Sequence, residues 1–247
     1  MTTDVRTAPP TTHRPDPTRR IALAGGLLYL VTFAASIPQL ALFADLVADP
    51  VAFVSTPGSN TAVLWGSWLE VITALSGVGT ALALYPVTRR VSRTAAIGFV
   101  SSRVVEAGMI LVGVLCVLSL VALRGDLAGA VGAEAGALGV VGQALVEVRQ
   151  WSFLVGPGLI PGLNALFLGY VMYRSRLVPR IIPTVGLVGA PLIIMSATVT
   201  MLGGWDQVSV AGSLCALPIA LWEFSLGVWL TVKGFRPTAA AATARAA

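Results

Sequence analysis

Six long stretches of apolar residues follow one another along the chain, and shorter polar segments separate them. Each stretch has about twenty residues or more, which is the length that an α-helix needs to cross the hydrocarbon core of a membrane. Lipid offers the backbone no hydrogen-bond partners, so apolar spans of this length are helical. The pattern predicts an all-α fold, a polytopic transmembrane helical bundle with six membrane spans. The predicted spans are 21–43, 61–85, 95–123, 151–173, 184–202 and 210–232.

Two tails flank this predicted transmembrane domain of residues 21–232. Residues 1–20 are rich in Thr, Pro and Arg, and residues 233–247 are rich in Ala. Neither tail has enough bulky apolar residues to build a packed core, so both are expected to be disordered.

The chain around the fourth span departs from a plain apolar pattern in two ways. Residues 138–150 mix apolar with polar residues, and they form either an interfacial helix before the span or an extension of it. Within the span, Pro157 and Pro161 each remove a helical hydrogen bond, which predicts a bend. The bend either exposes backbone carbonyls to a cavity, as in transporters, or only lets helices pack closely.

Composition supports the membrane assignment. Hydrophobic residues make up 56% of the 247 residues and charged residues 11%, whereas a soluble domain averages about 25% charged residues. The two cysteines lie in apolar runs, and the one histidine, His13, lies in the N-terminal tail. A metal site built from Cys and His within the membrane is therefore not expected.

Basic residues gather on one side of the predicted membrane. Thirteen of the 16 Lys and Arg residues lie in the two tails, in the loop after the second span or in the loop after the fourth span. By the positive-inside rule, these loops and both termini are cytoplasmic. The net charge of +5 then reflects orientation in a lipid bilayer, and binding to nucleic acid is not expected.

The third predicted span carries two opposite charges in a segment that is otherwise apolar. Arg103 and Glu106 are three residues apart, so they share one face of a helix and can form an ion pair. A charge at the bilayer centre costs about 2.5–3.5 kcal/mol on insertion scales, and such residues normally face the interior of a bundle. This face of the third span is therefore expected to contact other helices.

Other spans bring polar side chains to a similar depth. Counted from the cytoplasmic ends, four side chains lie roughly 13–14 Å deep, while Glu106 and Glu70 lie about 18 Å and 22 Å deep. The four are Tyr29, Arg103, Asn164 and Glu223. Together these six residues form the candidate site for a small solute or an ion.

Charge counting leaves two interpretations of this set. One arginine faces three glutamates, so at least one glutamate needs a proton, a polar neighbour, water or a cation. A polar pocket that binds or transports a small solute or ion accounts for the surplus. The alternative is a structural or regulatory membrane subunit whose buried charges only hold the bundle together. Transport predicts a water-accessible cavity that reaches Arg103 and Glu223, and the structural role predicts a dry, paired cluster.

Motifs for catalysis and for cofactors are missing from the sequence. The predicted spans contain no histidine to act as a base beside a serine nucleophile, and H-E-x-x-H and G-x-S-x-G do not occur. No Walker or dinucleotide-binding glycine pattern occurs, so no cofactor is expected. Chemistry with Glu and Arg alone is the one enzymatic alternative that the residues leave open, and a non-enzymatic role is favoured.

Several segments together resemble one known family. They are GLLYLVTFAASIP, NTAVLWGSWLEVITALSGVGTALALYPVTRR, GFVSSRVVEAGMILVGVL and GLNALFLGYVMYRSRLVPRIIPTVGL. Between about Arg20 and Leu202 the chain is similar to the bacterial membrane proteins grouped as domain of unknown function 4386. The resemblance implies a multi-pass protein of the inner (plasma) membrane. It implies no catalytic residues, because the family has no assigned activity.

Overall fold

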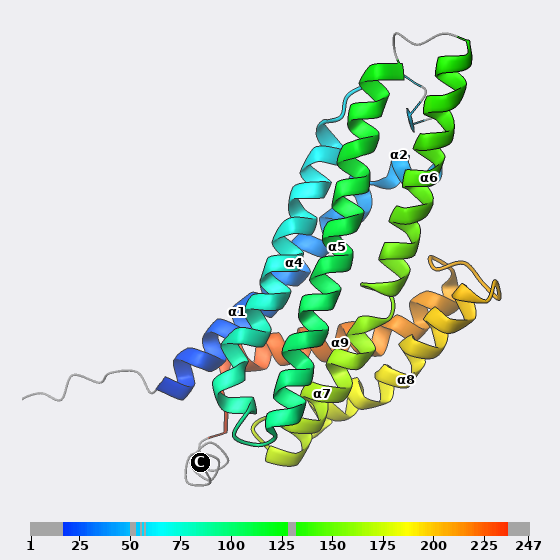
Figure 1. Ribbon diagram of the computed structural model, residues 1–247. Helices are drawn as coiled ribbons and strands as arrows, with labels where there is room; N and C mark the ends of the chain where they lie inside the picture. The colour runs from blue at the N-terminus through cyan, green and yellow to red at the C-terminus, as the bar shows by residue number, and fades with distance from the viewer. Residues whose placement is uncertain (1–16, 50–52, 55, 57, 128–131, 237–247) are drawn as a thin grey trace, which may run out of the picture.

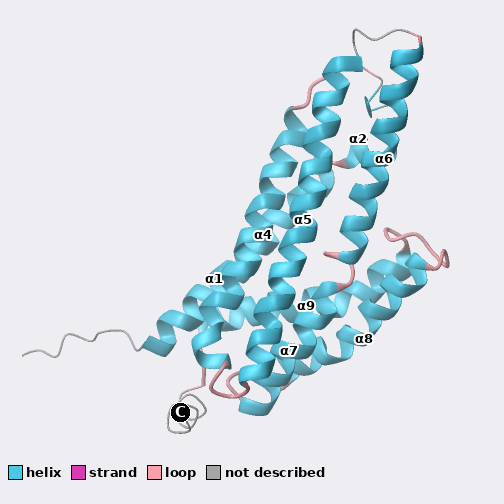
Figure 2. Ribbon diagram, in the orientation of Figure 1, coloured by secondary structure: helices cyan, strands magenta, loops and turns pink. Residues whose placement is uncertain are grey.

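The computed structural model describes residues 17–49, 53–54, 56, 58–127 and 132–236 of the chain. Its helices are α1 (Pro17–Leu42), α2 (Ala44–Ala48), α4 (Thr61–Thr88), α5 (Arg93–Leu127), α6 (Ala133–Val155), α7 (Ile160–Ser175), α8 (Ile181–Met201) and α9 (Val210–Val232) (Figure 1). The described ranges contain no strand, and Figure 2 shows helices joined by loops. The predicted all-α fold is confirmed.

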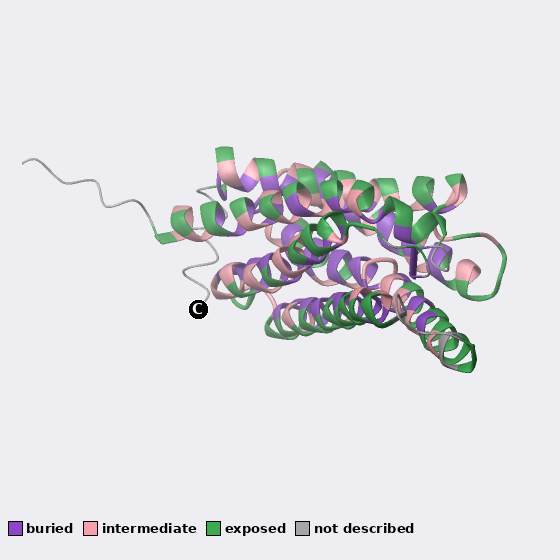
Figure 3. Cartoon of the chain, turned by 90° about the horizontal axis from the view of Figure 1, so that it is seen from above, coloured by how far each residue is buried: buried purple, intermediate pink, exposed green. Residues whose placement is uncertain are grey.

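Six helical segments of the described chain are long and apolar enough to cross a membrane, which confirms the predicted number of spans. They are Pro17–Leu42, Thr61–Thr88, Arg93–Asp126, Gly136–Ser175, Ile181–Met201 and Val210–Val232. Large apolar side chains such as Leu75 and Leu115 are about two-thirds exposed. Figure 3 shows buried residues where helices face one another and exposed residues on the outer faces. An apolar outer surface of this extent suits contact with lipid.

Six of the long helices close into a ring. Each helix packs against the next in the order α1, α4, α5, α7, α8 and α9, and α9 packs back against α1. Helix α6 packs mainly against α5. A large cluster of buried apolar side chains joins these helices, with Tyr29, Phe99 and Trp222 among its members. The ring therefore has an interior that several helices share.

Glycines allow neighbouring helices of the ring to approach closely. A Cβ at Gly26 of α1 would lie 2.6 Å from the backbone nitrogen of Thr231 and 2.8 Å from the backbone oxygen of Gly227 on α9. A Cβ at Gly186 of α8 would lie 2.6 Å from the ring of Trp222 on α9. Close packing of this kind drives helix association in lipid, where the hydrophobic effect between helices is lost.

The fourth span consists of two helices separated by a break. α6 ends at Val155 and α7 begins at Ile160, so residues 156–159 lie between them. The Phe153 carbonyl accepts a hydrogen bond from the Gly158 N–H at 3.0 Å, because the proline between them has no N–H to donate. Residues 138–150 lie inside α6 and extend the span, and the chain changes direction at the break (Figure 1).

The two ends of the described chain meet at the same end of the bundle. Arg19 of α1 donates to the Leu230 carbonyl of α9 at 3.0 Å and to the next carbonyl at 2.7 Å. The last carbonyls of a helix have no partner within it, so the guanidinium caps α9. Residues 17–20, predicted as part of the disordered tail, already belong to α1. The remaining tail residues, 1–16 and 237–247, lie outside the described residues.

Candidate functional site

Six buried or nearly buried polar side chains from four helices meet inside the ring, and we call them the Arg103 cluster. They are Tyr29 of α1, Ser102, Arg103 and Glu106 of α5, Asn164 of α7 and Glu223 of α9. Each lies about ten residues from the helix end near the two termini, which is roughly 15 Å along a helix. Five of the six belong to the set that the sequence predicts at neighbouring depths.

Arg103 is the centre of this cluster. Its Nη1 donates to Glu106 Oε2 at 2.9 Å, and its Nη2 forms an ion pair with Glu223. Nη2 also donates to the Tyr29 hydroxyl oxygen at 3.4 Å, and the guanidinium carbon lies 5.4 Å from the centre of the Tyr29 ring. A planar guanidinium presents several donors in a fixed fork, so it can serve carboxylates on different helices at once. Arg103 thereby connects α5 to α1 and α9.

A chain of hydrogen bonds extends the cluster to α7. Asn164 Nδ2 donates to Glu106 Oε2 at 2.7 Å, and Ser102 Oγ donates to Asn164 Oδ1 at 2.6 Å. Both ends of the Asn164 amide are therefore held by side chains of α5. Hydrogen bonds in a low-dielectric interior polarise one another, so a complete chain of this kind orients each member strongly.

The Arg103 cluster is closed off from the surface and carries a surplus of negative charge. Arg103 is 3% exposed, and the side chain of Glu223 is 12% exposed. The ring of Phe99 lies beside the guanidinium at 5.7 Å, and a Cβ at Gly77 of α4 would lie 3.8 Å from Arg103. Because one guanidinium faces two carboxylates, the fully ionised cluster has one negative charge too many.

Glu70 lies outside the Arg103 cluster, which corrects the sequence-based hypothesis of one site containing all six candidates. It is on α4, and Arg149 Nη2 of α6 donates to its Oε1 at 2.5 Å. Residues 138–150 continue into α6, so Arg149 is carried into the bundle to meet Glu70. Arg103 and Arg149 together therefore face three glutamates, and the surplus charge belongs to Glu106 and Glu223.

The pair of Arg149 and Glu70 is packed between aromatic and small residues. The Arg149 guanidinium carbon lies 5.3 Å from the centre of the Phe43 ring and 5.4 Å from that of Phe153. A Cβ at Gly113 of α5 would lie 2.9 Å from Arg149 Nη1. Glycine at this position leaves the room that the guanidinium occupies.

A thin apolar layer separates the two charged groups. Ala74 of α4 and Ala107 and Ile110 of α5 form a buried apolar cluster. Along α4, Gly77 faces Arg103 and Glu70 lies two turns earlier on the same face, roughly 10 Å away. Helices α4 and α5 therefore carry charged groups at two depths of the bundle.

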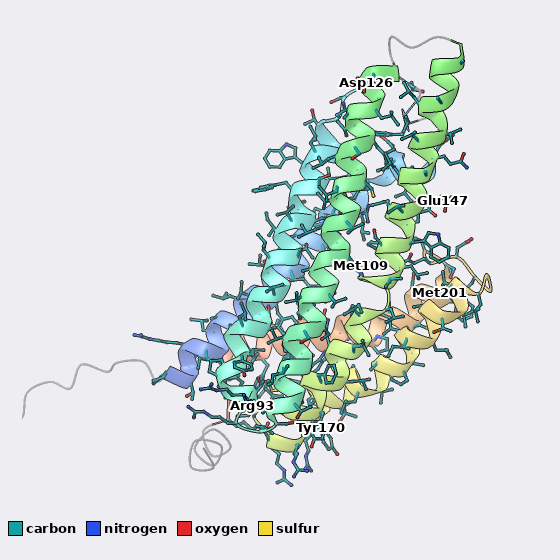
Figure 4. The ribbon with its side chains drawn as sticks, viewed as in Figure 1. Arg93, Met109, Asp126, Glu147, Tyr170 and Met201 are labelled. Atoms are coloured by element: carbon teal, nitrogen blue, oxygen red, sulfur yellow. The ribbon has the colours of Figure 1, made fainter. Side chains whose placement is uncertain are left out.

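The break in the fourth span lies between these two depths. A Cβ at Gly156 would lie 2.7 Å from Met109 Cβ and 3.7 Å from the Glu106 carbonyl oxygen, so the break packs against α5 (Met109 is labelled in Figure 4). Helix α6, before the break, carries Arg149, and α7, after the break, carries Asn164. In transporters, helices broken near mid-membrane line the substrate site.

Ser102 and Arg149 take part in these contacts without belonging to the predicted set, and each had a signal in the sequence. Ser102 directly precedes Arg103, within the polar start of an otherwise apolar span. Arg149 lies within residues 143–151, which contain no glycine or proline and lead directly into the apolar fourth span. A continuous helix through that stretch would have placed a second arginine inside the bundle.

Comparison with known proteins identifies a family. The sequence model of the family described as Domain of unknown function (DUF4386) matches residues 24–234. No curated protein and no solved structure matches the chain. The matched range includes the Arg103 cluster, the pair of Arg149 and Glu70, and the break between α6 and α7. The chain therefore belongs to the family described as Domain of unknown function (DUF4386).

Proposed function

We propose that the Arg103 cluster binds a small solute or ion that carries positive charge, and that the protein transports it across the plasma membrane. Both termini are cytoplasmic in this proposal, in keeping with the positive-inside rule. The cluster is then reached from the cytoplasmic half of the membrane. The multi-pass helical architecture and the charge balance of the cluster support the proposal.

The surplus carboxylate is the observation that carries this proposal. Glu106 and Glu223 both contact Arg103, so the single positive charge of the guanidinium balances only one of the two negative charges. An unbalanced charge away from water is costly unless it is neutralised. A bound proton, metal cation or ammonium group neutralises it, whereas a cluster that only joins helices needs no more than a neutral pair of Arg and Glu.

The neighbours of the surplus charge also suit a binding site. The Tyr29 hydroxyl and the Asn164 amide are neutral hydrogen-bonding groups of the kind that orient small ligands in otherwise apolar pockets. Asn164 belongs to α7, which begins after the break in the fourth span. A movement of α7 relative to α5 would open the contact between Asn164 and Glu106, and alternating access needs a rearrangement of this kind.

A structural or regulatory subunit is the second candidate, and the pairing within the closed cluster favours it. Both carboxylates contact Arg103, and Arg103 is 3% exposed. In this alternative the charges only fix how α1, α5, α7 and α9 meet, as buried polar groups do in some bundles.

Glu223→Gln separates the two candidates. The substitution removes the surplus charge, preserves the shape of the side chain and leaves the pair of Arg103 and Glu106. We expect the purified variant to remain folded in detergent, with a thermal unfolding midpoint close to that of the wild type. We also expect it to lose proton flux into reconstituted vesicles and to be stabilised less than the wild type by sodium, potassium or ammonium chloride, measured against choline chloride at constant ionic strength.

Glu147→Gln is the matched control, because Glu147 is an exposed glutamate on α6 (Figure 4). This variant should respond to cations and protons as the wild type does. The proposal is wrong if Arg103→Gln, Glu106→Gln and Glu223→Gln all lose folded protein to the same extent while the wild type carries no protons and responds to these cations no more than Glu223→Gln does. That result would leave the structural candidate.

A further inference from the structure

Three buried side-chain oxygens around Glu70 have no hydrogen-bond partner among the described residues. They are Glu70 Oε2, Gln39 Oε1 and Thr73 Oγ1. Glu70 is 2% exposed and Gln39 is 7% exposed. Buried polar atoms without partners are rare in folded proteins, so each of the three calls for an explanation, such as a bound water or ion. We call Gln39, Glu70, Thr73 and Arg149 the Glu70 cluster.

The contacts between α1 and α4 fix how these two helices are aligned. A Cβ at Gly79 of α4 would lie 3.3 Å from the side chain of Leu28 on α1. A Cβ at Gly66 of α4 would lie 2.9 Å from the ring of Phe43, directly after α1. The helices therefore run antiparallel with one defined register.

This register brings the three oxygens to the same contact between α1 and α4. Gln39 lies one helical turn before Phe43, and the Phe43 N–H donates to the Gln39 carbonyl at 3.0 Å. Glu70 lies one turn after Gly66, so it stands opposite Gln39 in an antiparallel pair. Thr73 follows one turn later on the same face of α4. The guanidinium of Arg149 lies over the Phe43 ring, which places it beside the same contact.

The chemistry of these oxygens suits a small monovalent cation. A carboxylate, an amide carbonyl and a hydroxyl are hard oxygen ligands, and hard cations prefer such ligands. The set contains one carboxylate, whereas divalent cations in proteins are generally held by more negative charge. A sodium ion matches both the ligand type and the single charge.

Arg149 supplies the positive charge that Glu70 needs while no cation is bound. Its side chain is 14% exposed, compared with 3% for Glu70, so the arginine is the more accessible member of the pair. The nearby Trp65 and Trp68 are more than half exposed, and tryptophans of this kind gather at the membrane–water interface. A long arginine side chain close to that interface can extend its guanidinium into water. Arg149 can therefore leave Glu70 when a cation arrives.

We propose that Glu70, Gln39 and Thr73 form a binding site for a monovalent metal cation, and that Arg149 is a tethered counter-ion which the cation displaces. This site is about two turns along α4 from the Arg103 cluster, on the other side of the apolar layer of Ala74 and Ile110. It goes beyond the proposed function, because it exists whether or not the Arg103 cluster binds a ligand.

Sodium-dependent stabilisation of the full-length protein tests this site. The thermal unfolding midpoint is measured in detergent as sodium chloride replaces choline chloride at constant ionic strength. Each variant is also made in a Glu223→Gln background, so that a response of the Arg103 cluster does not contribute. We expect sodium to raise the midpoint in this background, and Glu70→Gln to abolish the rise.

Substitution of Arg149 gives the sharper result, because it removes the competitor and leaves the site. Arg149→Gln should lower the half-saturating sodium concentration by about tenfold, a usual size for coupling between two ligands. Gln39→Leu should raise that concentration by about tenfold, since a ligand to a charged group is lost. Glu147→Gln, at an exposed glutamate on α6, should change neither value.

Four results would overturn the assignment. Sodium could act like choline in the wild type, in the Glu223→Gln background and in Arg149→Gln. The response could survive Glu70→Gln, or disappear with Glu223→Gln alone, which would assign sodium to the Arg103 cluster instead. A midpoint that depends on pH but not on sodium would make a proton the occupant. If Glu70→Gln does not fold, Arg149→Gln and Gln39→Leu still decide between these outcomes.

Discussion

The Arg103 cluster and the Glu70 cluster each contain an arginine paired with a glutamate, yet they differ in charge and in the helices that they join. The Arg103 cluster unites side chains from four helices and has two carboxylates for one guanidinium. The Glu70 cluster has one carboxylate for one guanidinium, and three of its oxygens have no partner among the described residues. The Arg103 cluster has an excess of negative charge, whereas the Glu70 cluster is neutral and has oxygen acceptors without hydrogen-bond partners.

This difference shows that ion pairs between helices can differ in charge balance and in the number of helices that depend on them. In the Arg103 cluster, the arginine contacts Glu106 of its own helix, Glu223 of α9 and Tyr29 of α1, so its loss affects three helices. In the Glu70 cluster, the arginine pairs with one carboxylate, and the arginine side chain is the more exposed of the two. The following predictions test this contrast, from the largest expected effect to the smallest.

Removal of the two arginines should have unequal effects on stability. Arg103→Gln leaves Glu106 and Glu223 buried together without a positive charge, which should cost about 3–5 kcal/mol, the usual loss for breaking a buried ion pair. Arg149→Gln leaves one carboxylate near the interface and should cost about half as much. Thermal and denaturant unfolding in detergent measure both variants. Equal losses, or a larger loss for Arg149→Gln, would contradict the contrast between the clusters.

A second neutral substitution should rescue one cluster better than the other. Adding Glu70→Gln to Arg149→Gln removes the last buried charge of the Glu70 cluster and should recover about 1–3 kcal/mol relative to Arg149→Gln. Adding Glu106→Gln to Arg103→Gln leaves Glu223 still charged, so the recovery should be smaller. Double-mutant cycles on the unfolding free energy measure both recoveries. Equal recoveries would mean that the surplus carboxylate of the Arg103 cluster carries no charge.

Two glycines that face the arginines should respond differently to alanine. A Cβ at Gly77 would make an ordinary contact of 3.8 Å with Arg103, so Gly77→Ala should stabilise the protein by about 0.5–1 kcal/mol through helix propensity. A Cβ at Gly113 would lie 2.9 Å from Arg149 Nη1, so Gly113→Ala should lose that gain as the guanidinium is displaced. Unfolding midpoints compare the two variants directly. A gain of equal size in both would show that Arg149 moves aside freely.

Ser102→Ala should have the smallest effect. It removes the donor that holds Asn164 Oδ1 and leaves every charged group in place. We expect a loss of about 0.5–1.5 kcal/mol, the usual net contribution of a hydrogen bond. Under the proposed function, ligand-induced stabilisation should also weaken, because Asn164 loses its fixed orientation. A variant with unchanged stability and unchanged ligand response would remove Ser102 from the cluster.

The spans and the Arg103 cluster could be predicted because strong physical rules act on single residues there. A charge in lipid is costly enough that Arg103 and Glu223 must face inward, and depth along a helix follows from counting residues. The same rules place Tyr29 and Asn164 at nearly the same level. Five members of the cluster could therefore be predicted from the amino-acid sequence alone.

The position of Glu70 could not be predicted because it depends on where one helix ends. The sequence of residues 138–150 is compatible with an interfacial helix and with an extension of the fourth span. Arg149 would lie near the lipid headgroups in the first case and inside the bundle in the second. Pro157 and Pro161 predict a bend, but the break at residues 156–159 depends on packing against Met109. The register between α1 and α4, which brings Gln39 to Glu70, also depends on contacts between distant residues.

The three-residue spacing between Arg103 and Glu106 matters during synthesis. Helices leave the ribosome and enter the bilayer in chain order, so α5 must be inserted before α9 has been made. Because Glu106 neutralises Arg103 on the same helix face, α5 enters the translocon with its buried charges already paired. Glu223 arrives with the last helix, when the other partners are already assembled. Glu223, which brings the surplus negative charge, is therefore the last of the buried charges to join the bundle.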